Sequence, residues 1–447
     1  MAKIESVIKR SGAVVTFNPE RITNAIYRAA VAVGGRDRSI AERLTSQVVR
    51  LLEEQNPGEH VPTVEEIQDM VEKVLIENGH ARVAKAYILY REERARSRRL
   101  RARMAAQPSE NIPWAKIWHI LDWATTHSLH TSKSYNTRVQ DGEIHQIVRE
   151  SEEAYNEDVE NAAEMIASRM GQLKLVIITG PSSSGKTTTT AKIAQRLERM
   201  GHHLVALNLD NYFFDLEQHP KDEFGDYDFE TPQALDIAQI NAHLNCLIRG
   251  EEILMPFYDF KTGQRTERLT QMRLKKDELI LIDSLHGLYP ALTQGIDADQ
   301  TFKVYLEPLL QMKDADGVYF RWADIRLIRR MLRDASHRAY SPQKTLEHWH
   351  YVRSSEMRNI VPYFGTANYI VNSAMPYELS LYRHKLIDQF GMWTELYRNN
   401  PLREDAYMRA NRAYKMLQQV VPLADDSIVP KDSVIREFIG GSIYDLH

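Results

Sequence analysis

The stretch Gly180-Pro-Ser-Ser-Ser-Gly-Lys-Thr-Thr188 constrains the fold of this chain most strongly. It fits the pattern G-x-x-x-x-G-K-[ST] without a mismatch, and it lies between an apolar run at 175–178 and a helical pattern at 187–200. Gly180 and Gly185 let the backbone take conformations that a side chain would block, so successive N–H groups can surround phosphate oxygens at a helix start. The sequence therefore predicts a strand, a phosphate-binding loop and a helix that bind a nucleoside triphosphate.

The residues of this loop carry distinct expected roles. Lys186 is expected to reach the β- and γ-phosphates, and the hydroxyl of Thr187 is expected to bind Mg²⁺. The predicted cofactors are therefore ATP and Mg²⁺. The residues expected to bind the nucleotide are Gly180, Pro181, Ser182, Ser183, Ser184, Gly185, Lys186, Thr187 and Thr188.

Length and composition narrow the class of protein. A chain of 447 residues is long enough for two or three domains with cores of their own. Its 57 Lys and Arg against 61 Asp and Glu give a net charge of -4, which argues against a dedicated nucleic-acid partner. The single cysteine, Cys246, excludes an internal disulfide framework and a multi-cysteine zinc site. Because no apolar run reaches about eighteen residues and the start carries no apolar signal segment, we expect a soluble cytoplasmic protein without a membrane partner.

Residues 1–104 are predicted to form a small, mostly helical domain. The pattern at 7–17 predicts two short strands that turn at Ser11-Gly12. Asn18 and Pro19 then supply an N-cap and a first-turn proline for a helix that ends near Val33. Further helices are predicted at about 38–54, at 64–78 and from 80 onward.

This opening resembles the ATP-cone, the regulatory nucleotide-binding domain of ribonucleotide reductases and their repressors. The resemblance rests on Val7, Lys9, Arg10, Gly12, Phe17, Arg21, Ile22, Asn24 and Ala25, and on residues 81–91, which are similar to the closing helix of that domain. It implies that Lys9, Arg10 and Arg21 face the phosphates of an effector nucleotide, ATP or dATP, and that Val7 and Ile22 belong to the same allosteric site. The alternative is a degenerate cone that serves only as a surface for association between copies of the chain.

Residues 105–170 are expected to form a linker and a helical segment. The basic run at 91–103 lacks interleaved aromatic residues, so a solvated helix end is favoured over a nucleic-acid patch. After the linker, helices are predicted around 114–123 and from about 144 to 170.

From 171 to 390 the pattern alternates between strand and helix, which predicts an α/β fold with a parallel sheet covered by helices on both faces. Residues 391–447 are expected to be a helical extension of this core. Ligands of such sheets bind at the carboxyl ends of the strands, so the residues just past those ends are the site candidates. The strand candidates are 173–179, 203–209, 278–283, 302–306 and 368–372.

Two carboxylates follow strand candidates at this edge. Asp210 follows the second strand and is predicted to accept a proton from an attacking hydroxyl. Asp283 ends the apolar strand at 278–283, which is the position of a carboxylate that holds Mg²⁺ directly or through water.

A third candidate group is a basic helical face. Arg326, Arg330 and Arg333 are spaced i, i+4 and i+7, so they share one side of a helix. Such a face could close over the triphosphate and neutralise charge in the transition state. A solvated basic face is the alternative.

Several motifs together resemble the uridine kinase and phosphoribulokinase group of P-loop NTPases, and in particular its long bacterial nucleoside kinase branch. They lie at 180–188, 210–212, 227–232, 256–265, 284–290, 323–330 and 433–442. The resemblance implies ATP- and Mg²⁺-dependent phosphorylation of the 5′-hydroxyl of a nucleoside such as uridine or cytidine. By position it makes Asp210 the general base, gives catalytic roles to Lys186, Arg326 and Arg330, and places Glu230, Tyr258 and Arg265 in the substrate pocket.

The chain departs from the short uridine kinases at three positions. Glu230 stands where they have aspartate, and Gly263 aligns with the histidine that reads their pyrimidine base. Asp283-Ser284 replaces their usual Glu-Gly. Phosphoryl transfer is still expected, but specificity for uridine does not follow.

Two other functions stay open at this point. A kinase of a small sugar phosphate, as in phosphoribulokinase, would use the same scaffold. A non-catalytic nucleotide sensor would bind ATP in both domains and signal through a partner or through association with further copies of the chain. The leading prediction is a kinase with a nucleoside-like substrate and a nucleotide effector at the N-terminal domain.

Overall fold

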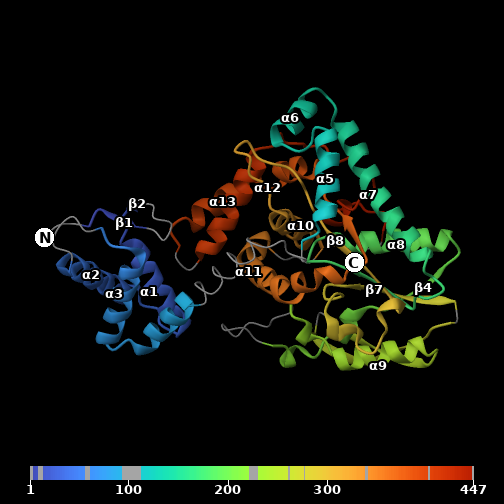
Figure 1. The fold of residues 1–447 in the computed structure, drawn as a ribbon, viewed down its shortest axis with the longest axis horizontal. Coiled ribbons are helices and arrows are strands. Elements are labelled where there is room, and N and C mark those ends of the chain that lie inside the picture. The colour runs from blue at the N-terminus through green and yellow to red at the C-terminus, as the bar shows by residue number, and fades with distance from the viewer. Residues whose placement is uncertain are drawn as a thin grey trace. The chain divides into compact units, whose positions relative to one another are not determined.

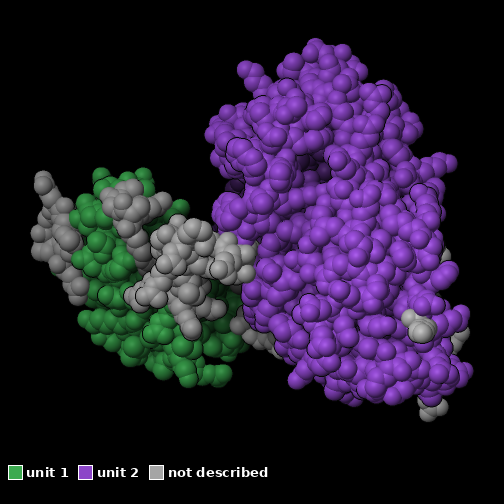
Figure 2. Space-filling model, turned by 45° about the vertical axis from the view of Figure 1, so that its right-hand side comes forward, with its two compact units in different colours: residues 1–109, 399–402 green, residues 110–398, 403–447 purple. Residues whose placement is uncertain are grey.

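The computed structural model describes residues 4–8, 14–55, 61–92, 112–220, 230–259, 262–275, 277–337, 341–400 and 403–444. The chain forms two compact units, residues 1–109 with 399–402 and residues 110–398 with 403–447 (Figure 2). Several expectations lie outside the described residues. They concern Lys9, Arg10, the turn at Ser11-Gly12, the basic run beyond 92, the linker up to 111 and the motif residues 227–229.

The first unit joins a short hairpin to helices. Strands β1 (Ser6–Ile8) and β2 (Val14–Thr16) pair antiparallel. Helices α1 (Glu20–Ala32), α2 (Arg38–Gln55) and α3 (Val64–Glu77) follow, and residues 81–92 are also helical. The predicted strands and helices are thereby confirmed.

Local sequence explains the helices of this unit. Thr63 and Glu66 form a capping box, in which each side chain accepts a hydrogen bond from the backbone N–H of the other. On α1 the buried residues Ile22, Ile26 and Ala29 recur every three or four positions. They pack with Val48 of α2 and Val74 of α3 in one core, because this spacing places them on a single helical face.

The second unit is built on a parallel sheet (Figure 1). Its strand order is β4-β7-β3-β8-β9, and every pairing is parallel. The strands are β3 (Leu175–Thr179), β4 (His203–Ala206), β7 (Glu278–Ser284), β8 (Thr301–Glu307) and β9 (Tyr369–Asn372). All five strand candidates are confirmed, and the strand that leads into the glycine-rich loop lies at the centre of the sheet.

Helices cover both faces of this sheet. On β3, Val176 and Ile178 pack into one core cluster with α7, α8 and α10, whereas Leu175 and Ile177 pack into another with α9 (Figure 1). Because successive strand residues point to opposite faces, a continuous apolar run requires cover on both sides. The helices are α5 (Trp114–Thr126), α6 (Ser132–Gln140), α7 (Ile144–Ala167), α8 (Lys186–Arg199), α9 (Ile237–Ile248), α10 (Trp322–His337), α11 (Pro342–Asn359), α12 (Glu378–Tyr397), α13 (Glu404–Gln418) and α14 (Arg436–Ile439).

Three features differ from the expectations. Strand β4 ends at Ala206 instead of 209, because the Asn208 side chain accepts a hydrogen bond from the Asp210 N–H and starts a short 3₁₀ helix, η1 (Leu209–Tyr212). An antiparallel ribbon of β5 (Glu252–Asp259) and β6 (Gln264–Arg273) was not predicted as strands. The division expected at 390 falls inside α12, where Phe390 packs into the core that also holds β3.

Within the described ranges, no helix combines the length and the apolar character needed to cross a membrane.

Candidate functional site

The glycine-rich loop runs from the end of β3 to the start of α8, and its shape depends on close packing. A Cβ atom at Gly180 would lie 2.3 Å from the carbonyl oxygen of Leu306 on β8. Gly185 has φ +96°, and a Cβ atom there would lie 2.3 Å from the side chain of Val434. Both positions therefore require glycine, and α8 begins directly after them, so its first N–H groups lie at the loop.

Lys186, Thr187 and Asp283 meet beside this loop. Asp283 on β7 is paired in register with Ile178 of β3, which places it next to the strand that leads into the loop. Burial raises the pKa of Asp283 to about 7, while nearby Lys186 and a hydrogen bond from the Thr187 hydroxyl favour its ionised form. Burial also lowers the pKa of Lys186, and its ammonium group donates to the Pro181 carbonyl at 3.4 Å.

The donor set of Thr187 and Asp283 fits Mg²⁺. This ion takes oxygen ligands and is usually held by one or two carboxylates together with substrate phosphates. The described residues contain no group of three or more His, Cys, Asp or Glu arranged to hold a metal, so phosphate oxygens would have to complete the coordination. The prediction of a nucleotide-linked Mg²⁺ site is consistent with this arrangement.

Asp210 lies at the same edge of the sheet. It belongs to η1, directly after β4, and its side chain is exposed. Its charge contributes to the raised pKa of Asp283, which places the two carboxylates near each other. The fold thus brings Asp210, Asp283 and Lys186 together, although they lie on three different segments.

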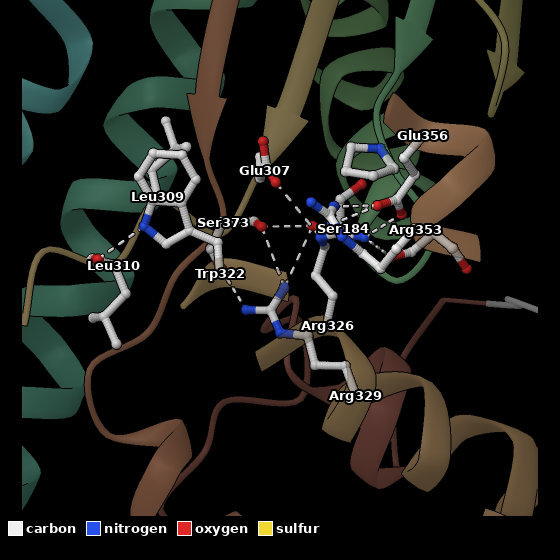
Figure 3. Close-up of polar contacts among 12 residues, drawn as sticks. Ser184, Glu307, Leu309, Leu310, Trp322, Arg326, Arg329, Arg353, Glu356 and Ser373 are labelled. Carbon is white, nitrogen blue, oxygen red and sulfur yellow. Dashed lines mark hydrogen bonds and ion pairs between the residues drawn. The ribbon is translucent and has the colours of Figure 1, made fainter. Parts of the chain in front are cut away.

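Two arginines of α10 are buried beneath the loop (Figure 3). Arg326 makes a bidentate ion pair with Glu356 at 2.5 and 3.0 Å and donates to the Ser182 carbonyl at 3.1 Å. Arg329 pairs with Glu378 at 2.7 and 3.0 Å and donates to the carbonyl of Ser373. Both guanidinium groups are fully buried and hydrogen-bonded to protein atoms, so here they support the loop from below.

Arg330 connects the loop to the predicted acceptor side. Its guanidinium group contacts the Ser182 hydroxyl at 3.2 Å and the Glu230 carboxylate at 2.6 Å. The Glu230 side chain is 17% exposed, and the charge of Arg330 and its hydrogen bond outweigh the effect of partial burial and lower the pKa of this carboxyl group. Arg333, the third member of the predicted face, pairs with Asp334 at 3.3 Å.

Tyr258 and Arg265 lie opposite each other on the β5–β6 ribbon. The Tyr258 ring packs against Phe213 at 5.6 Å and stacks with His219 at 6.4 Å between ring centroids. The Arg265 guanidinium group instead donates to the carbonyls of Phe213 and Tyr212, both at 2.7 Å. Arg265 therefore holds the segment that follows Asp210 in place. These hydrogen bonds go to protein carbonyls, so a contact between Arg265 and the substrate stays a prediction.

The C-terminal tail also belongs to this site, which the sequence analysis did not anticipate. Glu437 is 4% exposed and accepts hydrogen bonds from the N–H and the hydroxyl of Thr188, at 3.1 and 2.9 Å. Asp432 of the same tail pairs with Lys192 of α8 at 2.9 Å. A carboxylate therefore occupies one of the helix-start N–H groups that such loops offer to phosphates.

The N-terminal unit brings together only part of its predicted site. Val7 and Ile22 are 9% and 6% exposed and belong to the hydrophobic core, so their side chains support the domain from inside. The side chain of Arg21 is exposed. Its contact with an effector phosphate stays a prediction.

A hollow of about 1040 Å³ lies away from the glycine-rich loop, between α5, α10, α11 and α13. Trp118, Trp322 and Met408 are among the residues that line it. It adjoins the buried cluster of Figure 3 through Glu307 and Arg353. The chemistry predicted from the sequence therefore lies outside this hollow.

Comparison with known proteins relates two regions of the chain to known families. The sequence model of the ATP cone domain matches residues 5–96, and that of the phosphoribulokinase / uridine kinase family matches residues 175–379. A uridine kinase from Bacillus licheniformis is 32% identical over 181 residues, which are 40% of this chain and 76% of the relative. A uridine kinase from Deinococcus deserti is 28% identical over 195 residues, which are 43% of this chain and 84% of the relative.

The N-terminal unit has relatives of another kind. A vitamin B12-dependent ribonucleoside-diphosphate reductase from Thermoplasma acidophilum is 44% identical over 96 residues, which are 20% of this chain and 12% of that protein. The matched length is close to that of the segment that the ATP cone domain model matches. The chain therefore belongs to the phosphoribulokinase / uridine kinase family and carries an ATP cone domain ahead of its kinase region.

Proposed function

We propose that this protein transfers the γ-phosphoryl group of ATP to the 5′-hydroxyl of a nucleoside such as uridine or cytidine. The observation that carries the proposal is the meeting of Lys186, Asp283 and the exposed Asp210 at one edge of the sheet, beside the glycine-rich loop. A phosphate-binding cation, a carboxylate for metal and an exposed carboxylate for a proton are the parts that phosphoryl transfer needs.

The loop residues hold the donor. The N–H groups at the start of α8 and the Lys186 ammonium group would surround the phosphates, and Thr187 and Asp283 would hold Mg²⁺. When bound, the ion would neutralise charge that develops on the phosphate oxygens. Arg330, which spans Ser182 and Glu230, stands between donor and acceptor and would add positive charge there.

Asp210 acts on the acceptor in this proposal. Its carboxylate would accept the proton of the attacking hydroxyl while the Arg265 braces keep its segment in place. Glu230 and Tyr258 would line the acceptor pocket. The ionised carboxylate of Glu230 would repel the phosphate of a sugar phosphate, so the chemistry favours a neutral acceptor.

The N-terminal unit is proposed to bind ATP or dATP as an effector. The match to the ATP cone domain and the exposed Arg21 support this role. An effector can shift activity only by binding the active and inactive arrangements with different affinity.

The first test is ADP release by the full-length protein with Mg-ATP and a panel of ribonucleosides, deoxyribonucleosides and ribulose 5-phosphate. Nucleoside-dependent ADP release that Asp210→Asn reduces about 100- to 10,000-fold, with ATP affinity nearly unchanged, would support the proposal. Asp299→Asn, an exposed aspartate before β8 at the opposite edge of the sheet, is the matched control. Activity with ribulose 5-phosphate alone, or ATP binding without turnover of any acceptor, would contradict it.

A further inference from the structure

A buried histidine lies beside the proposed acceptor pocket and has no role in the mechanism described above. His286 follows β7, three residues after Asp283, and its backbone N–H donates to the Ser284 hydroxyl at 3.2 Å. The next residue, Gly287, packs against β3 so tightly that a Cβ atom would lie 2.4 Å from the Ile177 side chain. The loop that carries His286 is therefore held firmly against the central strand.

The imidazole of His286 is buried and incompletely satisfied by hydrogen bonds. The residue is 4% exposed, and neither ring nitrogen reaches a described residue with good hydrogen-bond geometry. The carbonyl of Glu230, which also accepts a hydrogen bond from the Ser355 hydroxyl, lies close enough to interact with one ring nitrogen. Buried polar groups without partners are rare and cost about 1–3 kcal/mol each, so the remaining nitrogen is a candidate contact for a bound molecule.

The surroundings of this ring define what could bind. Glu230 and Lys186 are the charged groups that act on it, and burial lowers the pKa of His286 to about 4. The ring is therefore neutral at physiological pH and carries one N–H donor and one acceptor nitrogen. It cannot neutralise a phosphate, whereas a hydroxyl group offers the complementary acceptor and donor.

We propose that His286 hydrogen-bonds a hydroxyl of the acceptor and thereby selects acceptors that carry a vicinal diol, as a ribose does. Glu230, whose carboxylate is held by Arg330, would accept a hydrogen bond from the neighbouring hydroxyl. The assignment rests on the proposed kinase function and names a specificity-determining residue for it. It also places recognition on the sugar, in a chain that has Gly263 where short uridine kinases place a base-reading histidine.

The experiment varies the acceptor and the side chain at position 286 together. The wild type, His286→Leu and His286→Asn are assayed by ADP release with uridine, or the ribonucleoside with the highest turnover, and with its 2′-deoxy and 3′-deoxy analogues. In the wild type, removal of the contacted hydroxyl should lower kcat/KM about 10- to 100-fold. In His286→Leu this preference should shrink to within about threefold, and His286→Asn, which keeps a donor and an acceptor, should retain part of it.

Two further measurements separate specificity from structure. The dissociation constant for ATP should stay within about twofold in both variants, because the substitution removes no group that the donor contacts. A full ribose preference in His286→Leu, or an equal loss with all three acceptors, would overturn the assignment. If the wild type releases ADP with none of the nucleosides, the proposed function itself fails, which is a different result from an active enzyme whose preference ignores His286.

Discussion

The neutral state of His286 can be tested through stability as well as through activity. An ordinary histidine has a pKa near 6.5, and burial lowers the pKa of His286 to about 4. The charge of Lys186 also lowers this pKa, whereas the charge of Glu230 raises it. Between these values the unfolded chain binds a proton at this position and the folded chain does not. Stability must therefore fall as the pH drops through this window, since protons favour the state that binds more of them.

The magnitude follows from the two pKa values. The full difference corresponds to about 3 kcal/mol, and the part lost between pH 7 and pH 5 is about 2 kcal/mol. His286→Asn keeps a polar side chain of similar reach but cannot titrate. We therefore expect the free energy of unfolding of the wild type, minus that of His286→Asn, to decrease by about 2 kcal/mol from pH 7 to pH 5.

The assay is urea denaturation of the full-length protein at pH 7 and pH 5, followed by tryptophan fluorescence. His286→Leu, which cannot titrate either, should show the same change relative to the wild type even if its absolute stability differs. A difference between wild type and variants that is constant within about 0.5 kcal/mol would refute the reasoning. The pKa of His286 in the folded protein would then lie near its value in the unfolded chain, and the ring would be protonated at pH 5.

Three further outcomes follow from the site and its supports. Asp210→Asn should lower kcat about 100- to 10,000-fold while ATP affinity in isothermal titration changes little, and an equal loss of both would argue against a role as base. Glu356→Gln leaves the buried Arg326 charge without its bidentate partner and should destabilise the protein by about 3–5 kcal/mol in urea denaturation. The exposed ion pair of Arg249 with Glu251 offers the control. Glu251→Gln should barely change the free energy of unfolding, because water screens this pair, and similar losses for both variants would contradict the expectation. Glu437→Gln keeps an acceptor for Thr188 but removes a negative charge beside the phosphate site. ATP should therefore bind about tenfold tighter at low salt, as measured by isothermal titration. Unchanged or weaker binding would contradict this role of the C-terminal tail.

The parts of the site that the sequence predicts are those defined by short-range order. An apolar run, a glycine-rich loop and a helix occur within 175–200, and each constrains its neighbour. Asp283 is recognisable because it ends a buried strand, and parallel strands present their carboxyl ends at one edge. The roles assigned to these residues stay predictions, but their convergence is present in the structure.

The β5–β6 ribbon was not predicted because the sequence of β6 lacks the usual pattern of a strand. Strand β6 reads Gln-Arg-Thr-Glu-Arg-Leu-Thr-Gln-Met-Arg over Gln264–Arg273, which contains no apolar run. A strand of a two-stranded ribbon is stabilised by its partner, so its sequence can remain polar. Only the pairing with β5 identifies it.

The sequence by itself determined the order of the candidate site residues along the chain: the glycine-rich loop, then Asp210, the predicted proton acceptor, then Asp283, the predicted metal ligand. The tertiary structure alone decided the partners. Glu437 reaches Thr188 across 249 positions, and Arg329 reaches Glu378 across 49. The pairing of buried charges depends on which segments the fold brings into contact, and no local pattern encodes that distance. For the same reason, only the folded chain reveals that the imidazole of His286 lies buried beside Glu230.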